Sequence, residues 1–146
     1  MQTVNTILIH APRERIVETV ADLALWPAIL PHFRYIRFHE QSPTRNIVKM
    51  AASQGGIPVS WVTEQRIDRE GGRISFRHQR SWTKGLEVHW SFVETSAGVQ
   101  VEVVHSWRFR WPVFAWIFEP LIGRFFIRDL ADKTLFRMKA YLENGR

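Results

Sequence analysis

The sequence contains no cysteine, so it has no disulfide bond, no thiolate metal site and no cysteine nucleophile. It also lacks the short motifs of many enzymes: there is no HExxH, no GxSxG, no phosphate-binding loop and no dinucleotide fingerprint. We therefore expect no metal and no cofactor. The longest apolar stretch, residues 113–127, is shorter than the ~20 residues that span a bilayer. The amino end does not resemble a signal peptide, which predicts a cytoplasmic protein.

Aromatic residues are abundant instead, with seven Trp and ten Phe among 146 residues. Side chains of this size must fill a core or line a cavity. The formal net charge is +6, but the basic residues are scattered and alternate with acidic ones on the expected outer faces. Such a mixed surface opposes phosphate, so nucleic acid is not an expected partner.

The last third of the chain has the pattern of a helix. Between residues 121 and 142, apolar side chains recur at spacings of three, four and seven, which is the period of an amphipathic helix. Pro112 suits a first helical turn, whereas Pro120 would interrupt a helix. The pattern predicts a short helix over 113–118, a break, and a long helix over 121–142 whose apolar side must be buried.

Most of the preceding chain has strand character. The expected elements are a strand over 4–10, short helices over 13–22 and 24–32, and strands over 33–40 and 47–52. Alternation of apolar and polar residues then predicts four long strands joined by short turns, over 57–68, 74–82, 86–92 and 99–109. The economical fold is one α+β domain over residues 1–146. In it, a curved antiparallel sheet of six to seven strands wraps around the C-terminal helix.

Several short stretches carry a family resemblance: Ile9-His10-Ala11-Pro12-Arg13-Glu14, Val20-Ala21-Asp22-Leu23, Trp26-Pro27, Leu30-Pro31, Val59-Ser60-Trp61-Val62-Thr63-Glu64 and His89-Trp90-Ser91-Phe92. With them the whole chain resembles the helix-grip fold of the START-like superfamily, also called Bet v 1-like or SRPBCC. Within it the chain is similar to the polyketide cyclase/dehydrase family, which includes coenzyme Q-binding START proteins. The resemblance implies the fold, but the superfamily hosts transporters, binders, cyclases and hydrolases on one scaffold.

The strand alternation places one set of side chains on the face of the sheet toward the helix: Trp61, Thr63, Gln65, Phe76, His78, Arg80, Trp90, His105 and Trp107. Five of these are polar and need either partners or a ligand, namely Thr63, Gln65, His78, Arg80 and His105. A curved sheet and its helix leave an apolar cavity between them. We expect this face to bind a hydrophobic ligand there, together with Phe33, Tyr35 and Phe125.

The resemblance also implies where catalytic groups would stand. The aromatase/cyclase branch has an inner-face arginine where this chain has Gln65, and a pocket tyrosine where it has Phe33, with Tyr35 two residues further along. His105 matches a polar pocket residue of that branch, and Arg80 roughly matches a second inner arginine. In an enzyme, His105 would be the acid or base and Arg80 would orient carbonyl oxygens. The alternative is a core histidine bonded to a neighbour and an arginine that reaches solvent.

Three functions are compatible with these patterns. The favoured one is binding or transport of a hydrophobic small molecule, such as a lipid, an isoprenoid quinone or a polyketide-like aromatic. The second is a polyketide cyclase or dehydratase that acts on a poly-β-keto chain. The third is a membrane-surface or protein-interaction module, because aromatic residues in 111–126 are flanked by arginines as at an interface. The first and third are compatible, since a lipid carrier must load at a membrane.

Overall fold

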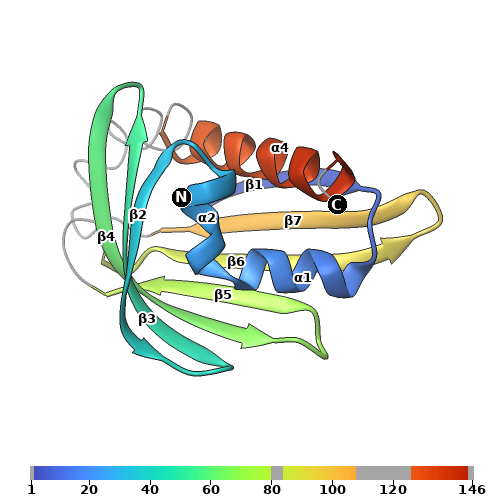
Figure 1. The fold of residues 1–146 in the computed structure, drawn as a ribbon, viewed down its shortest axis with the longest axis horizontal. Helices are drawn as coiled ribbons and strands as arrows, with labels where there is room; N and C mark the ends of the chain where they lie inside the picture. The colour runs from blue at the N-terminus through green and yellow to red at the C-terminus, as the bar shows by residue number, and fades with distance from the viewer. Residues whose placement is uncertain (1, 80–83, 108–125, 145–146) are drawn as a thin grey trace.

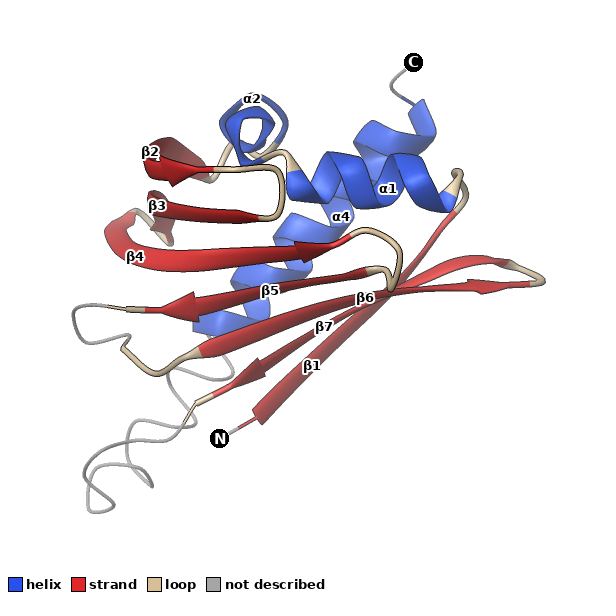
Figure 2. Cartoon of the chain, turned by 90° about the horizontal axis from the view of Figure 1, so that it is seen from below, coloured by secondary structure: helices blue, strands red, loops and turns tan. Residues whose placement is uncertain are grey.

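The computed structural model describes residues 2–79, 84–107 and 126–144 (Figure 1). Its strands are β1 (Gln2–Ile9), β2 (Phe33–Gln41), β3 (Arg45–Gln54), β4 (Ile57–Asp68), β5 (Arg73–His78), β6 (Glu87–Thr95) and β7 (Gly98–Ser106). Its helices are α1 (Arg13–Ala21), the 3-10 turn η1 (Leu23–Leu25), α2 (Trp26–Ile29) and α4 (Arg128–Asn144). The strands form one antiparallel sheet in the order β1-β7-β6-β5-β4-β3-β2. The helices lie on one face of this sheet (Figure 2).

This arrangement confirms the predicted helix-grip fold, with differences at the ends of elements. The second short helix is divided into η1 and α2, because Pro27 sits in the first turn of α2 and starts a new helix there. The described part of the long helix begins at Arg128 and continues to Asn144, two residues beyond the predicted end. The predicted helix over 113–118 and the break at Pro120 lie outside the described residues.

The alternating strands bury the predicted faces. Buried apolar side chains alternate along β5, β6 and β7, as the period of two requires. Ile57 departs from the pattern: it starts β4 beside the turn at Gly55 and Gly56 and is 61% exposed. The period of two therefore determines which way a side chain points, but burial also depends on what covers that end of the sheet.

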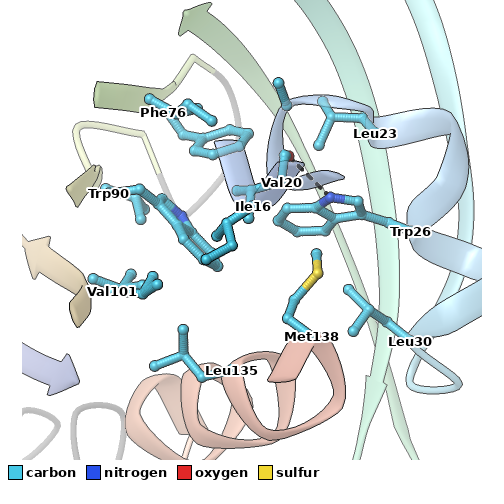
Figure 3. Close-up of a cluster of buried hydrophobic side chains, with 14 of the residues drawn as sticks. Ile16, Val20, Leu23, Trp26, Leu30, Phe76, Trp90, Val101, Leu135 and Met138 are labelled. Atoms are coloured by element: carbon cyan, nitrogen blue, oxygen red, sulfur yellow. Dashed lines mark hydrogen bonds between the residues drawn. The ribbon is translucent and has the colours of Figure 1, made fainter. Parts of the chain in front are cut away.

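Aromatic packing joins α2 to the middle of the sheet (Figure 3). The Trp26 ring lies 5.1 Å from Phe33, 6.0 Å from Phe76 and 6.1 Å from Trp90, measured between ring centroids. Its indole N–H donates a 3.1 Å hydrogen bond to the carbonyl oxygen of Val20, near the end of α1. Trp26 therefore has a fixed position between the short helices and the sheet.

Side-chain hydrogen bonds fasten α4 to both flanks of the sheet. Asn5 on β1 donates to the carboxylate of Asp132 at 2.6 Å and to the Arg128 carbonyl at 3.2 Å. On the other flank, Gln54 at the end of β3 donates to Asp129. The apolar side of the helix faces the sheet between these attachments, with buried Ala131, Thr134, Leu135, Met138 and Leu142. Within the described parts of the chain, no helix combines the length and apolar character that a membrane crossing demands.

Candidate functional site

A cavity of about 90 Å³ lies between the sheet and the first half of α4. Its described lining is almost entirely apolar and aromatic: Trp26, Phe33, Met50, Val59, Trp61, Phe76, His78, Leu86, Val88, Trp90, Val103, His105, Trp107, Phe126, Ile127, Leu130, Ala131 and Thr134. None of these residues is Lys, Arg, Asp or Glu, so His78 and His105 are the only residues of the described lining that can become charged by protonation. The arrangement is therefore suited to an uncharged, hydrophobic molecule.

The cavity is small for its class, since pockets for drug-sized ligands enclose about 300–1,000 Å³. The reason is the packing of the aromatic rings, which contact one another across the space that the sheet curvature leaves. Phe33, for example, touches both Trp26 and Trp61 at centroid distances of 5.1 and 6.1 Å. An apolar cavity that binds benzene encloses about 150 Å³, so in this conformation even a one-ring ligand requires side chains to move.

His78 ends β5 and turns its ring into the cavity. The imidazole stacks on Trp61, with the ring centroids 5.6 Å apart and the planes only 6° from parallel. His78 is 7% exposed, and its Nδ1 has no hydrogen-bond partner among the described residues. Burial, aided by the nearby His105, lowers the pKa of His78 from 6.5 to about 3. The ring is therefore neutral at physiological pH, with one nitrogen able to donate and the other able to accept.

His105 reaches the same cavity from β7. It lies opposite Val88 of β6 and opposite Thr3 of β1 in the strand register. Its Nδ1 is buried and has no partner in the described chain, and the Thr3 hydroxyl oxygen is in the same situation. Burial lowers the pKa of His105 to about 4. The alternative of a core histidine bonded to a neighbour is thus not realised at Nδ1.

Seven of the predicted site residues line the cavity together: Phe33, Trp61, Phe76, His78, Trp90, His105 and Trp107. Tyr35, Thr63 and Gln65 do not line it. Tyr35 is half-buried on β2, with the Arg37 guanidinium 4.5 Å above its ring. Thr63 is fully buried opposite His78 but is not among the described lining residues. The ligand-binding role of all these residues stays a prediction.

Gln65 is fully buried and hydrogen-bonded, and it does not line the cavity. Its side-chain N–H donates to the Ala21 carbonyl at 3.1 Å, and its oxygen accepts from Asn46 at 2.8 Å. Ala21 is the last residue of α1, where carbonyls lack a partner within the helix. Gln65 therefore supplies a hydrogen-bond donor to a carbonyl at the end of α1, which explains a polar side chain at a fully buried position.

Arg80, Phe125 and nearly all of 111–126 lie outside the described residues.

The first half of α4, with Ile127 just before it, supplies lining that the sequence analysis does not assign to a site. Ile127, Leu130, Ala131 and Thr134 follow the spacing of three, four and seven that predicts one helical face. Thr134 also shares a 2.9 Å hydrogen bond with His32, a histidine to which the sequence analysis assigns no role. Burial, with Lys133 and Arg137 nearby, lowers the pKa of His32 to about 4.

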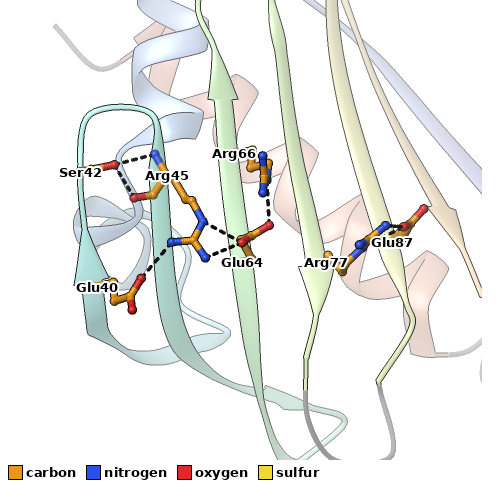
Figure 4. A network of polar contacts seen from close by, with 7 residues as sticks. All are labelled: Glu40, Ser42, Arg45, Glu64, Arg66, Arg77 and Glu87. Carbon is orange, nitrogen blue, oxygen red and sulfur yellow. Dashed lines mark hydrogen bonds and ion pairs between the residues drawn. The ribbon is translucent and has the colours of Figure 1, made fainter.

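The charged residues of the strands gather on the opposite, outer face of the sheet (Figure 4). Arg45 contacts Glu40 and Glu64, and Arg77 contacts Glu87. Hydrogen bonds from Arg66 and then Arg45 hold the pKa of Glu64 below its usual value. The Glu64 side chain is only 11% exposed, whereas the other members of these acid–base pairs are exposed to solvent. The charged and the apolar groups of the described strands are thus separated onto the two faces, and the described lining of the cavity contains no Lys, Arg, Asp or Glu.

Solved structures with the same fold cover nearly the whole chain. TTHA0849 from Thermus thermophilus superposes with a TM-score of 0.85 at 19% identity, covering 98% of this chain and 97% of that one. A START superfamily protein from Mycobacterium smegmatis gives a TM-score of 0.71 at 14% identity, with 97% of both chains covered. The di-domain ARO/CYC BexL of the BE-7585A biosynthetic pathway gives 0.77 at 23% identity, covering 98% of this chain and 46% of that chain.

Sequence comparison leads to the same group. The actinorhodin polyketide synthase bifunctional cyclase/dehydratase of Streptomyces coelicolor is 24% identical over 107 residues, which are 72% of this chain. The chain spans about a third (34%) of the length of that relative. The model of the family "Polyketide cyclase / dehydrase and lipid transport" matches residues 9–133, which is most of the chain. The family match covers most of the chain, so the chain belongs to the polyketide cyclase/dehydrase and lipid transport family.

Proposed function

We propose that the protein binds a hydrophobic small molecule, such as a lipid, an isoprenoid quinone or a polyketide-like aromatic, in the cavity between its sheet and α4. The observation that carries the proposal is the lining itself. Eighteen described residues enclose the cavity, none of them is Lys, Arg, Asp or Glu, and seven are Trp or Phe. A lining of this kind favours burial of apolar ligand surface, with a few polar atoms left to orient it.

Binding is favoured over catalysis by the state of the two histidines. General acid–base catalysis works best when the pKa of the catalytic group lies near the working pH. The pKa values of His78 and His105 are lowered to about 3 and about 4. At neutral pH both rings are uncharged, so neither can act as a strong acid, and both are weak bases. They are better suited to hydrogen-bonding a bound molecule than to moving its protons.

The binding proposal is tested by recovering the ligand. Native mass spectrometry and solvent extraction of the purified protein should reveal a lipophilic molecule that co-purifies with it. Ala131→Leu fills the cavity from α4 and should reduce recovery, whereas Ala140→Leu makes the same change on the same helix at a position that does not line the cavity. Equal recovery with both variants, or protein that is empty and does not bind added quinones and lipids, would contradict the proposal.

A second candidate function is polyketide cyclisation or dehydration, with His105 as acid or base and Arg80 as the group that orients carbonyl oxygens. It is supported by the likeness to a bifunctional cyclase/dehydratase and to a di-domain ARO/CYC protein. His105→Ala and Arg80→Ala should each abolish turnover of a poly-β-keto substrate while the protein stays folded. Unchanged rates in both variants would eliminate these assignments.

A further inference from the structure

Two imidazoles share a cavity whose other described lining residues are aliphatic or aromatic, apart from Thr134. His78 enters from the end of β5 and His105 from β7, and the pair lies close enough for a charge on His105 to influence His78. The Nδ1 atom of each ring is buried without a hydrogen-bond partner among the described residues. Thr134, the other polar residue of the lining, is already bonded to His32 and to the Leu130 carbonyl. Apart from the indole N–H groups of the tryptophans, the two histidines are therefore the polar groups of the described lining that have hydrogen-bonding capacity left.

Unpaired buried nitrogens destabilise a folded protein, because they lose their bonds to water and gain none in return. Apolar side chains of similar size would suit these two positions better if packing were their only role. The Thr63 hydroxyl, opposite His78, and the Thr3 hydroxyl, opposite His105, have no partner in the described chain either. The unused hydrogen-bonding capacity is thus concentrated around the two rings, as in a site whose partner is a ligand.

The rings are held in defined positions. The near-parallel stacking of His78 on Trp61 fixes the plane of the imidazole, because a rotation of the ring would break this contact. His105 lies near the end of β7, between Val88 of β6 and Thr3 of the edge strand β1. Two oriented groups from different strands can contact a single oxygen atom, or two oxygen atoms of one planar ligand.

The surroundings also determine the charge of that ligand. No described lining residue is Lys, Arg, Asp or Glu, so a carboxylate or an ammonium group would lose its hydration without gaining a counter-charge. The lowered pKa values of both histidines agree with this geometry, since each ring is neutral at physiological pH. Neutral oxygen groups, which need only a donor or an acceptor, do not incur this penalty.

We propose that His78 and His105 form a recognition site for a neutral oxygen group, a phenolic hydroxyl or a ketone carbonyl, on an otherwise apolar planar ligand. This inference rests on the proposed binding function and adds the chemical group by which the ligand is selected and oriented. Carboxylate-bearing molecules of the same shape should bind more weakly.

Three single-ring probes separate the contributions of a neutral oxygen group, an apolar group and a negative charge to binding. Phenol, toluene and benzoate carry a hydroxyl, a methyl and a carboxylate on the same ring. Each is titrated into the full chain and followed by NMR chemical-shift changes of the indole N–H groups. Phenol and toluene should both bind, and benzoate should bind at least about tenfold more weakly than phenol, a difference of about 1.4 kcal/mol. The ratio of phenol to toluene affinity should fall about fivefold or more in His78→Phe and in His105→Leu. It should stay unchanged in His89→Leu, whose side chain is exposed outside the cavity.

The outcomes distinguish the inference from the binding function beneath it. If toluene and phenol bind but their affinity ratio is the same in all variants, the cavity binds ligands and the histidine assignment is wrong. If benzoate binds as tightly as phenol, the charge argument is wrong. If none of the three probes binds, the proposed function fails and the inference fails with it. Should an apolar variant not fold, His105→Gln, which keeps hydrogen-bonding groups, provides a variant that should retain part of the phenol preference.

Discussion

Mild acid should destabilise this protein strongly, because its buried histidines must stay neutral to remain buried. His78 and His105 have pKa values lowered from 6.5 to about 3 and about 4. Between these values and 6.5, the unfolded chain binds protons that the folded chain does not. The free energy of unfolding therefore rises as the pH rises through this window. Conversely, it falls as the pH is lowered from about 6.5 toward 4.

The magnitude follows from the size of the window. A histidine that titrates near 6.5 when unfolded, and well below 5 when folded, loses about 2 kcal/mol of stability between pH 7 and pH 5. Two such groups lose about 4 kcal/mol, a large part of the 5–15 kcal/mol by which a domain is typically stable. His32 adds a smaller amount, because its ring is only half-buried.

Carboxylates do not obscure this window. The lowered pKa values of Glu64, Glu87, Asp129 and Glu143 start from 4.5 or 3.8, so the stability they confer is lost only as the pH falls below those values. Urea unfolding at pH 7, 6 and 5, extrapolated to water at each pH, measures the loss that is due to histidines.

Variants assign the loss to particular rings. His78→Phe and His105→Leu should each reduce the difference between pH 7 and pH 5 by about 2 kcal/mol, and exposed His89→Leu serves as the control. A wild-type stability that is the same at pH 5 and pH 7, or variants that keep the full difference, would refute the reasoning that the rings are buried and neutral.

Three further predictions concern other groups. At pH 7, His105→Leu should raise the free energy of urea unfolding by about 1 kcal/mol, because it removes an unpaired buried nitrogen; a loss of stability would show that the ring has a structural partner. Gln65→Leu should lower the same free energy by about 2–4 kcal/mol, since it leaves the side-chain N–H of Asn46 and the Ala21 carbonyl unpaired; a neutral effect would contradict the role of Gln65. If the 111–126 segment contacts membranes, anionic liposomes should float the protein, and Phe114→Asp with Phe118→Asp should abolish flotation.

The sequence predicts the fold well because its signals are local and repeated. Alternation along β4 to β7 indicates which side chains face inward, and the helical period in α4 indicates which side meets the sheet. The three aromatic residues Trp61, Trp90 and Trp107 all lie where this reasoning expects them. Each of these predictions depends only on the geometry of a single element.

The site is harder to predict because it depends on which element covers each part of the inner face. Gln65 and His78 both point inward, yet the end of α1 covers Gln65 and the cavity opens beside His78. Strand alternation does not predict this difference, because the difference arises from the path of the chain through α1 and α2. The size of the cavity is likewise a property of how Trp26, Phe33 and Trp61 pack together, which no pattern of spacing reports.

The attachment of α4 limits how the cavity can enlarge for a ligand. Asn5, Gln54 and His32 bond to Asp132, Asp129 and Thr134, so a shift of the whole helix would break contacts on both flanks at once. Trp26 is also fixed, by its bond to Val20. Trp61 is only half-buried, and a shift within the plane of its ring would break the edge contact with Phe33 while the indole stays stacked on His78. We therefore expect ligand entry to shift Trp61 and to leave α4 in place; a structure of the complex with α4 displaced and Trp61 unmoved would contradict this.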